Sequence, residues 1–252
     1  MPAPALQPLH REAFVMPNLL HPSSESPAFN PEHDLESEDG TEAVASTPFP
    51  NELSHFVYKR TYSRWVEDKG RRETWSETVD RYVTFISTER NIPVHVRNDI
   101  RSGIHSMDVL PSMRALWSAG DAARRDNTMM YNCSFVPLDS LKAFSELLYI
   151  LMMGTGVGFS VESQFVDNLP PVANLTGKTI DYTIPDSTDG WADAFFDGLQ
   201  EWFKGNKVNF DYSQIRPAGA PLKTKGGRAS GPEPLMRLFK FAEETVLAAA
   251  GR

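Results

Sequence analysis

The stretch YNCSFVPLDSLKAFSELLYILMMGTGVGFSV, residues 131–161, decides the fold class. It opens with a β-prone run over residues 131–136, which a proline ends. Asp139 is a good N-cap for the helix that follows, whose large apolar residues share one face. A glycine-rich turn over residues 154–158 then runs directly into a second strand-like segment. Strand, helix and strand in this order predict an α/β fold.

Periodic signals continue on both sides of this stretch. Thr74 and Glu77 form a capping box ahead of an amphipathic helix over about residues 75–90. A helix over about residues 188–204 and a strand over residues 208–212 follow the decisive stretch. No internal repeat is visible. The remaining expectations are an ordered loop region over residues 110–130, a loop-rich stretch over residues 163–187, a second capping box at Ser230 and Glu233, and a last helix still running when the chain ends at Arg252.

Composition excludes several classes of protein. The chain has 252 residues, a net charge of −8 and a single cysteine. One cysteine rules out a disulfide scaffold and a cysteine-based zinc site. The acidic balance argues against a generic nucleic-acid binder. No apolar run is long enough for a membrane span, and the N-terminus lacks a secretory signal. We therefore expect a cytoplasmic protein with no membrane and no direct nucleic-acid partner.

The first fifty residues differ from the rest in charge and in proline content. They hold 8 of the 33 acidic residues, 1 of the 25 basic residues and 9 of the 19 prolines. Such a composition buries too little apolar surface to offset the entropy of ordering. We expect a disordered acidic tail over residues 1–50, a helical N-terminal domain over 51–125, and an α/β part over 126–252.

The residues alone leave the chemistry open. Cys133 is read either as a buried, inert structural cysteine or as a thiol whose redox partner lies outside this chain. The glycines of residues 154–158 follow a helix and precede a strand, which is the reverse of a dinucleotide-binding loop. The basic segment over residues 223–232 suits either an anion or plain solvent. The six histidines do not cluster at metal-ligand spacing, so we assign no metal.

A series of short sequence motifs in a fixed order says more about the chemistry than the single residues do. They are Tyr58-Lys-Arg-Thr-Tyr-Ser-Arg-Trp65, Glu67-Asp-Lys-Gly-Arg71, Trp75-Ser-Glu-Thr-Val79, Pro111-Ser112 with Leu116-Trp117 and Gly120, Asn132-Cys133 with Phe135-Val136, Gly156-Val-Gly-Phe-Ser-Val161, Asp186 to Trp191, Ser213-Gln-Ile-Arg-Pro-Ala-Gly219, and Ala229-Ser-Gly-Pro-Glu-Pro-Leu235. In these motifs the chain resembles the N-terminal portion of the adenosylcobalamin-dependent (class II) ribonucleoside-triphosphate reductases of the monomeric type.

The resemblance implies a fold and an activity. The fold is a helical N-terminal domain followed by the first part of a ten-stranded α/β barrel, with an effector-site insertion. The activity is thiyl-radical conversion of ribonucleoside triphosphates to 2′-deoxyribonucleotides. It uses adenosylcobalamin, a deoxynucleotide effector and a thioredoxin-like dithiol reductant. The cofactor would be held mainly by a C-terminal remainder of the reductase.

The same resemblance assigns roles residue by residue. Cys133 matches the first cysteine of the redox pair, which reverses the structural interpretation of this thiol. Asn132, Gly156 and Ser112 match positions around the substrate nucleotide. Two further residues match the allosteric effector site: Asp139, an acidic residue at a helix start, and Arg216, near the effector phosphates.

One departure limits what the chain does by itself. The family's thiyl cysteine and second redox cysteine lie beyond the residues that match, and the chain holds a single thiol. We therefore expect a fragment or one piece of a split enzyme, inactive alone. The alternative is a stand-alone nucleotide-binding regulatory module without catalysis.

Overall fold

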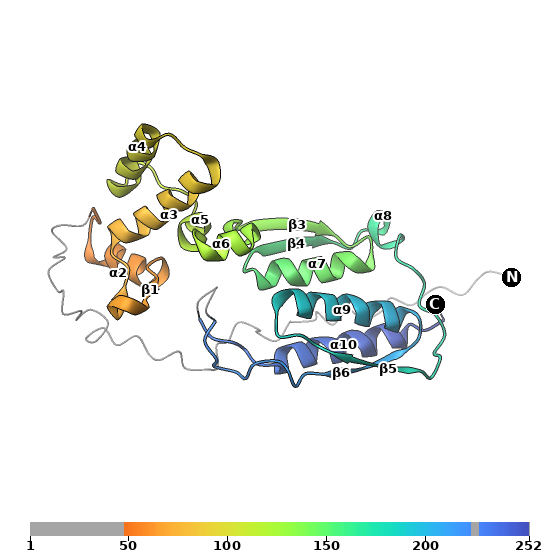
Figure 1. Cartoon of the computed structure of the whole chain (residues 1–252). Coiled ribbons are helices and arrows are strands. Elements are labelled where there is room, and N and C mark those ends of the chain that lie inside the picture. The colour runs from red at the N-terminus through yellow and green to blue at the C-terminus, as the bar shows by residue number, and fades with distance from the viewer. Residues whose placement is uncertain (1–47, 223–226, 252) are drawn as a thin grey trace. The chain divides into compact units, whose positions relative to one another are not determined.

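The computed structural model describes residues 48–222 and 227–251, all within one compact unit. The expected tail thus lies outside the described residues, apart from its last three positions. The expected division at residue 125 stays a prediction. Figure 1 shows a helical N-terminal portion followed by alternating strands and helices, which confirms the α/β class. Among the described residues, no helix has both the length and the apolar character to cross a membrane.

The helical portion spans residues 52–130. Its elements are α2 (Glu52–Thr61), β1 (Trp65–Val66), η2 (Glu67–Lys69), β2 (Arg71–Arg72), α3 (Trp75–Arg90), α4 (Val94–His105), α5 (Met113–Ser118), α6 (Asp121–Arg125) and η3 (Asn127–Met130). The predicted capping box of Thr74 and Glu77 starts α3, as expected. The prediction of a loop over residues 110–130 is wrong, because that stretch holds three short helical segments. Helices of four to six residues are too short to reveal their period.

The core of the helical portion extends beyond the expected boundary. Phe49, only 9% exposed, stacks on Tyr58 with ring centroids 5.0 Å apart. The folded part therefore begins before Asn51, where we expected it. A buried carboxylate, Glu73, pairs with Arg81 at 2.7 Å. Burial alone would raise the pKa of Glu73, but the bonds from Arg81 outweigh it and hold that pKa below its usual value.

The first strand–helix–strand unit consists of β3 (Cys133–Pro137), α7 (Leu141–Met152) and β4 (Gly156–Ser160). The two strands are parallel, and Cys133 lies opposite Gly156. Helix α7 covers one face of the pair through Val136 and Val157. On the other face Phe135 remains 61% exposed. One face of this strand pair therefore lacks a covering layer within the described residues.

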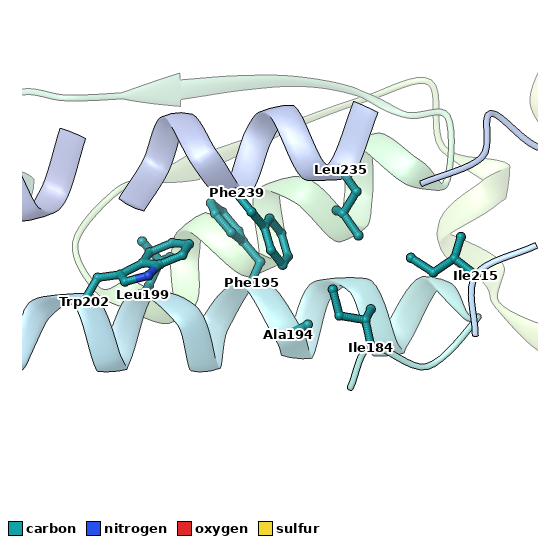
Figure 2. Close-up of a cluster of buried hydrophobic side chains, with 8 residues drawn as sticks. All are labelled: Ile184, Ala194, Phe195, Leu199, Trp202, Ile215, Leu235 and Phe239. Carbon is teal, nitrogen blue, oxygen red and sulfur yellow. The ribbon is translucent and has the colours of Figure 1, made fainter. Parts of the chain in front are cut away.

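The second strand–helix–strand unit consists of β5 (Thr179–Thr183), α9 (Thr188–Phe203) and β6 (Lys207–Asp211), again with parallel strands. The short helix α8 (Ser163–Val166) and strand β5 both lie within residues 163–187, which were expected only to be rich in loops. A further helix, α10 (Glu233–Ala248), packs against α9. Figure 2 shows Phe239 of α10 among Phe195 and Trp202 of α9.

The two units share one plan, although their sequences show no repeat. Each helix begins after an Asp–Ser pair whose serine is the N-cap: Ser140 accepts from the Ala143 N–H and Ser187 from the Gly190 N–H. Each helix is followed by a glycine with positive φ, Gly154 or Gly205. In both units the next strand starts two residues later. Helices α7 and α9 lie side by side (Figure 1), joined by a hydrogen bond from the Ser145 hydroxyl to the Ala192 carbonyl.

Three expectations about helix ends are wrong. The N-cap of α7 is Ser140, not Asp139, because the Ser140 hydroxyl accepts a hydrogen bond from the Ala143 N–H. The start of α10 has no side-chain cap; Pro232 takes the N-cap position, and the Ser230 hydroxyl instead bonds the Gly231 carbonyl. The last helix does not run on to the final residue, since it ends at Ala248.

Candidate functional site

Three of the predicted site residues meet at the first rung of the β3–β4 pair. Cys133 lies opposite Gly156, and the Gly156 N–H donates to the Asn132 carbonyl at 2.9 Å. The Cys133 side chain is exposed. A Cβ added at Gly156 would lie 3.5 Å from that carbonyl, an ordinary contact, so local packing does not require glycine there. The glycine leaves open backbone beside the thiol.

The segment that leads to the cysteine is held by a buried threonine. Thr155, 2% exposed, donates from its hydroxyl to the carbonyls of Thr128 and Tyr131, at 3.2 and 3.0 Å. These two bonds fix the end of η3 against the turn between α7 and β4. Hydrogen bonds on both strands therefore fix the backbone that carries Cys133.

Ser112 has a structural role in this fold. It is the N-cap of α5, and its hydroxyl accepts from the Ala115 N–H at 3.1 Å. From the same helix Arg114 reaches the turn before β4. A Cβ added at Gly154 would lie 2.8 Å from the Arg114 guanidinium. Helix α5 thus reaches the turn that leads into Gly156, but the structure gives no direct contact between Ser112 and Cys133.

A cavity with a volume of about 700 Å³ lies between the two strand–helix–strand units. Its walls come from the end of α6 and η3, the C-terminal end of α7, the N-terminal end of α9, and the loop between β6 and α10. This volume suits a small organic ligand such as a nucleotide. Its charged and aromatic lining residues include Arg125, Asp126, Tyr149, Asp186, Trp191, Arg216 and Arg228.

The cavity combines cationic groups with hydroxyls and apolar surface. Arg216 pairs with Asp186 at 2.7 Å, and Arg228 donates to the Gly219 carbonyl at 2.9 Å. The indole N–H of Trp191 is buried and has no hydrogen-bond partner within the described part of the chain. Guanidinium groups and the N–H groups at a helix start both favour phosphate oxygens. The arrangement therefore suits an anionic ligand that carries an apolar group.

The two residues predicted for an effector site do not lie together. Arg216 lines the cavity, at the C-terminal end of α7. Asp139 is exposed and precedes the N-terminal end of that helix. A helix of 12 residues is about 18 Å long, so its length separates the two positions. The acidic residue that does join Arg216 is Asp186, before the N-cap of α9.

Sequence reasoning found Arg216 and the basic segment that contains Arg228, but missed the rest of the cavity. Asp186 belongs to a second Asp–Ser pair ahead of a predicted helix, so a signal for it existed. Arg125, Asp126 and Tyr149 carried no signal, because long-range packing alone brings them together. The basic segment begins at residue 223, and its residues 223–226 lie outside the described residues. No group of three or more metal-ligating side chains occurs among those described.

Two family models match separate parts of the chain. The ribonucleotide reductase alpha domain matches residues 41–121. The insertion domain of B12-dependent ribonucleotide reductase matches residues 160–246. The second match contains β5, α9, β6 and most of α10, so the second strand–helix–strand unit corresponds to the insertion.

Curated relatives and a solved structure agree with these matches. The adenosylcobalamin-dependent ribonucleoside-triphosphate reductase of Euglena gracilis is 33% identical over 80% of this chain and 31% of its own length. That of Lactobacillus leichmannii is 30% identical over 81% of this chain and 37% of its own length. A crystal structure of a B12-dependent (class II) ribonucleotide reductase superposes with a TM-score of 0.70 and 27% identity, covering 82% of this chain and 39% of that one. The chain spans about a third of the length of these relatives.

Proposed function

This chain belongs to the family of adenosylcobalamin-dependent (class II) ribonucleotide reductases, and we propose that it supplies the N-terminal part of such an enzyme. The observation that carries the proposal is the first rung of the β3–β4 pair, where the exposed Cys133 lies opposite Gly156 and the Gly156 N–H bonds the Asn132 carbonyl. That face presents a reactive group and open backbone to a substrate.

Cys133 acts in this proposal as one thiol of a redox pair. The C2′–O bond of a ribonucleotide breaks, a C2′–H bond forms, and the oxygen leaves as water. The two electrons come from two thiols, which become a disulfide. The chain holds one cysteine, so the second thiol comes from the remainder of the reductase. The exposure of Cys133 leaves it accessible to that thiol and to a dithiol reductant. A redox thiol of this kind needs a reducing compartment such as the cytoplasm.

Three site residues have supporting parts in the proposal. The backbone of Asn132 and Gly156 holds the rung and approaches the substrate, while Ser112 fixes α5 beside the turn that leads into β4. The family's cofactor does not fit the described residues. The cavity between the two strand–helix–strand units is lined by arginines and hydroxyls, which suit phosphate rather than a corrin ring. We place adenosylcobalamin on the remainder of the enzyme and derive no step through it.

The cavity between the two strand–helix–strand units is our proposed site for a deoxynucleoside triphosphate effector. Arg216, Arg228 and Arg125 offer the charge for the phosphates. Trp191 offers an aromatic surface and an unpartnered N–H donor. Asp186 orients the Arg216 guanidinium through their ion pair. In this proposal Asp186 takes the place that sequence reasoning gave to Asp139.

Reconstitution tests the reductase role. The full chain is mixed with a separate polypeptide that covers the remaining two thirds of the Euglena gracilis relative. Adenosylcobalamin, a ribonucleoside triphosphate and a dithiol are added, and deoxynucleotide formation is measured. We expect product from the mixture and from neither piece alone.

Two variants sharpen that test. Cys133→Ser should abolish multiple turnover, whereas Ser134→Ala should retain it, because the Ser134 hydroxyl has no partner among the described residues. Multiple turnover by Cys133→Ser would refute the redox role. A mixture that associates but makes no product, with nucleotide binding by the chain alone, would favour a regulatory module.

A further inference from the structure

The cavity wall and the segment before Cys133 are the same piece of chain. Arg125, Asp126 and Met129 line the cavity. From Asp126 the chain passes through η3 and reaches Cys133 seven residues later. A ligand in the cavity therefore touches residues that lead directly to the exposed thiol.

Asp126 is bound at both carboxylate oxygens. One oxygen accepts from the Thr128 N–H at 2.8 Å and caps η3. The other accepts from the hydroxyl of Tyr149, on α7. Burial, together with the neighbouring Asp126 carboxylate, raises the pKa of Tyr149 well above its usual value. The phenol therefore stays protonated at neutral pH and remains a donor to Asp126.

The far end of η3 is fixed just as firmly. Thr155 donates to the carbonyls of Thr128 and Tyr131, and the next residue, Gly156, donates from its N–H to Asn132. Met129, 2% exposed, packs against Met153 inside a buried cluster. The turn is thus bound to α7 at its start and to β4 at its end, so hydrogen bonds connect Asp126 with the rung that carries Cys133.

We propose that Asp126 and Tyr149 are positioning residues, through which a nucleotide in the cavity sets the reactivity of the Cys133 thiol. This inference rests on the proposed function of the cavity. A ligand that contacts Tyr149 and Asp126 strengthens the hold on η3, so the thiol becomes less mobile and reacts more slowly. Neither residue touches the thiol; they act through η3 and the first rung of the β3–β4 pair.

The single cysteine makes the test direct. The full chain is alkylated with iodoacetamide with and without saturating dATP, dGTP, dTTP or dCTP, and modified Cys133 is quantified by mass spectrometry. Equilibrium dialysis measures binding of each nucleotide separately. We expect at least one bound nucleotide to slow alkylation by about fivefold, in the usual range of coupling between sites. Inorganic triphosphate controls for a purely electrostatic effect of phosphate on the thiol.

Two variants separate the inference from its alternatives. In Tyr149→Phe we expect the effect of bound nucleotide on alkylation to fall to less than about half of its wild-type value, because the link to Asp126 is gone. Tyr82→Phe is the matched control: Tyr82 is half-buried, its hydroxyl makes no hydrogen bond to another described residue, and it does not line the cavity, so the effect should persist. Asp126→Asn, which keeps an amide oxygen to cap η3, should weaken the effect if Tyr149→Phe does not fold.

Each outcome decides a different claim. Slower alkylation in the wild-type chain and in Tyr82→Phe, but not in Tyr149→Phe, supports the inference. Equal slowing in Tyr149→Phe overturns it, and so does nucleotide binding that leaves alkylation of the wild-type thiol unchanged. If no nucleotide binds, the proposed effector site fails, and the inference fails with it.

Discussion

The two strand–helix–strand units follow the same plan but use it differently. In the unit of β5, α9 and β6, the helix is enclosed by α10 and β6, and Trp202 is fully buried. In the unit of β3, α7 and β4, the strand face that carries Cys133 and Phe135 is uncovered among the described residues. One unit encloses its helix, while the other leaves a strand face that carries a thiol exposed. The cavity lies where the end of one helix meets the start of the other.

Removing a large aromatic side chain from each unit should give the largest difference in stability between the two units. Trp202→Ala leaves a large void in the enclosed core and should lower the free energy of unfolding by about 3–5 kcal/mol. Phe135→Ala removes a ring that is already 61% exposed and should cost less than about 1 kcal/mol. Urea denaturation of the full chain measures both. Comparable losses would mean that the open face is covered in solution.

The glycines after the two helices offer the next test. Both have positive φ, so alanine costs about 1–2 kcal/mol at either position. At Gly205 the new Cβ would also lie 2.1 Å from the Asn174 carbonyl oxygen, which is backbone. At Gly154 it would meet the end of the Arg114 side chain, which is free to move aside. Thermal melting should therefore show a larger loss for Gly205→Ala than for Gly154→Ala, and the reverse order would refute this account of the two turns.

Removing the two serine caps should give the smallest difference in stability between the two units. Ser187→Ala removes a hydrogen bond of 2.9 Å and should cost about 1 kcal/mol. Ser140→Ala removes one of 3.3 Å and should cost less than about 1 kcal/mol. Urea midpoints of the two variants give the comparison. A larger loss at Ser140 would show that α7 depends on its cap more than α9 does, contrary to the geometry.

Local signals predicted much of this fold. The capping box of Thr74 and Glu77 and the helix over residues 75–90 are correct, because a cap and a long apolar stripe need only neighbouring residues. The short helices of residues 113–130 were missed because none shows a full period. The N-cap of α7 was displaced by one residue, since Asp139 and Ser140 are both good caps and the backbone geometry decides between them.

The site was only half predictable for a related physical reason. Cys133, Asn132 and Gly156 were predicted from the family resemblance, and they meet in the structure because β3 and β4 pair in register. The cavity instead collects residues from four distant segments. The chain holds two Asp–Ser helix starts, and nothing local distinguishes Asp139 from Asp186. Packing of α7 against α9 determines which of them lies beside Arg216.

Nucleotide affinity tests the central claim most directly: the ligand site lies between the two units, at the start of α9. Equilibrium dialysis of the full chain with each deoxynucleoside triphosphate compares wild type, Arg216→Ala and Asp139→Ala. We predict that Arg216→Ala weakens binding by about tenfold or more, because a charge-assisted bond to phosphate is lost. Asp139→Ala should change nucleotide affinity by less than about twofold, because the Asp139 side chain is exposed and lies at the far end of α7. Loss of affinity in Asp139→Ala with none in Arg216→Ala would contradict the account and place the site at the start of α7.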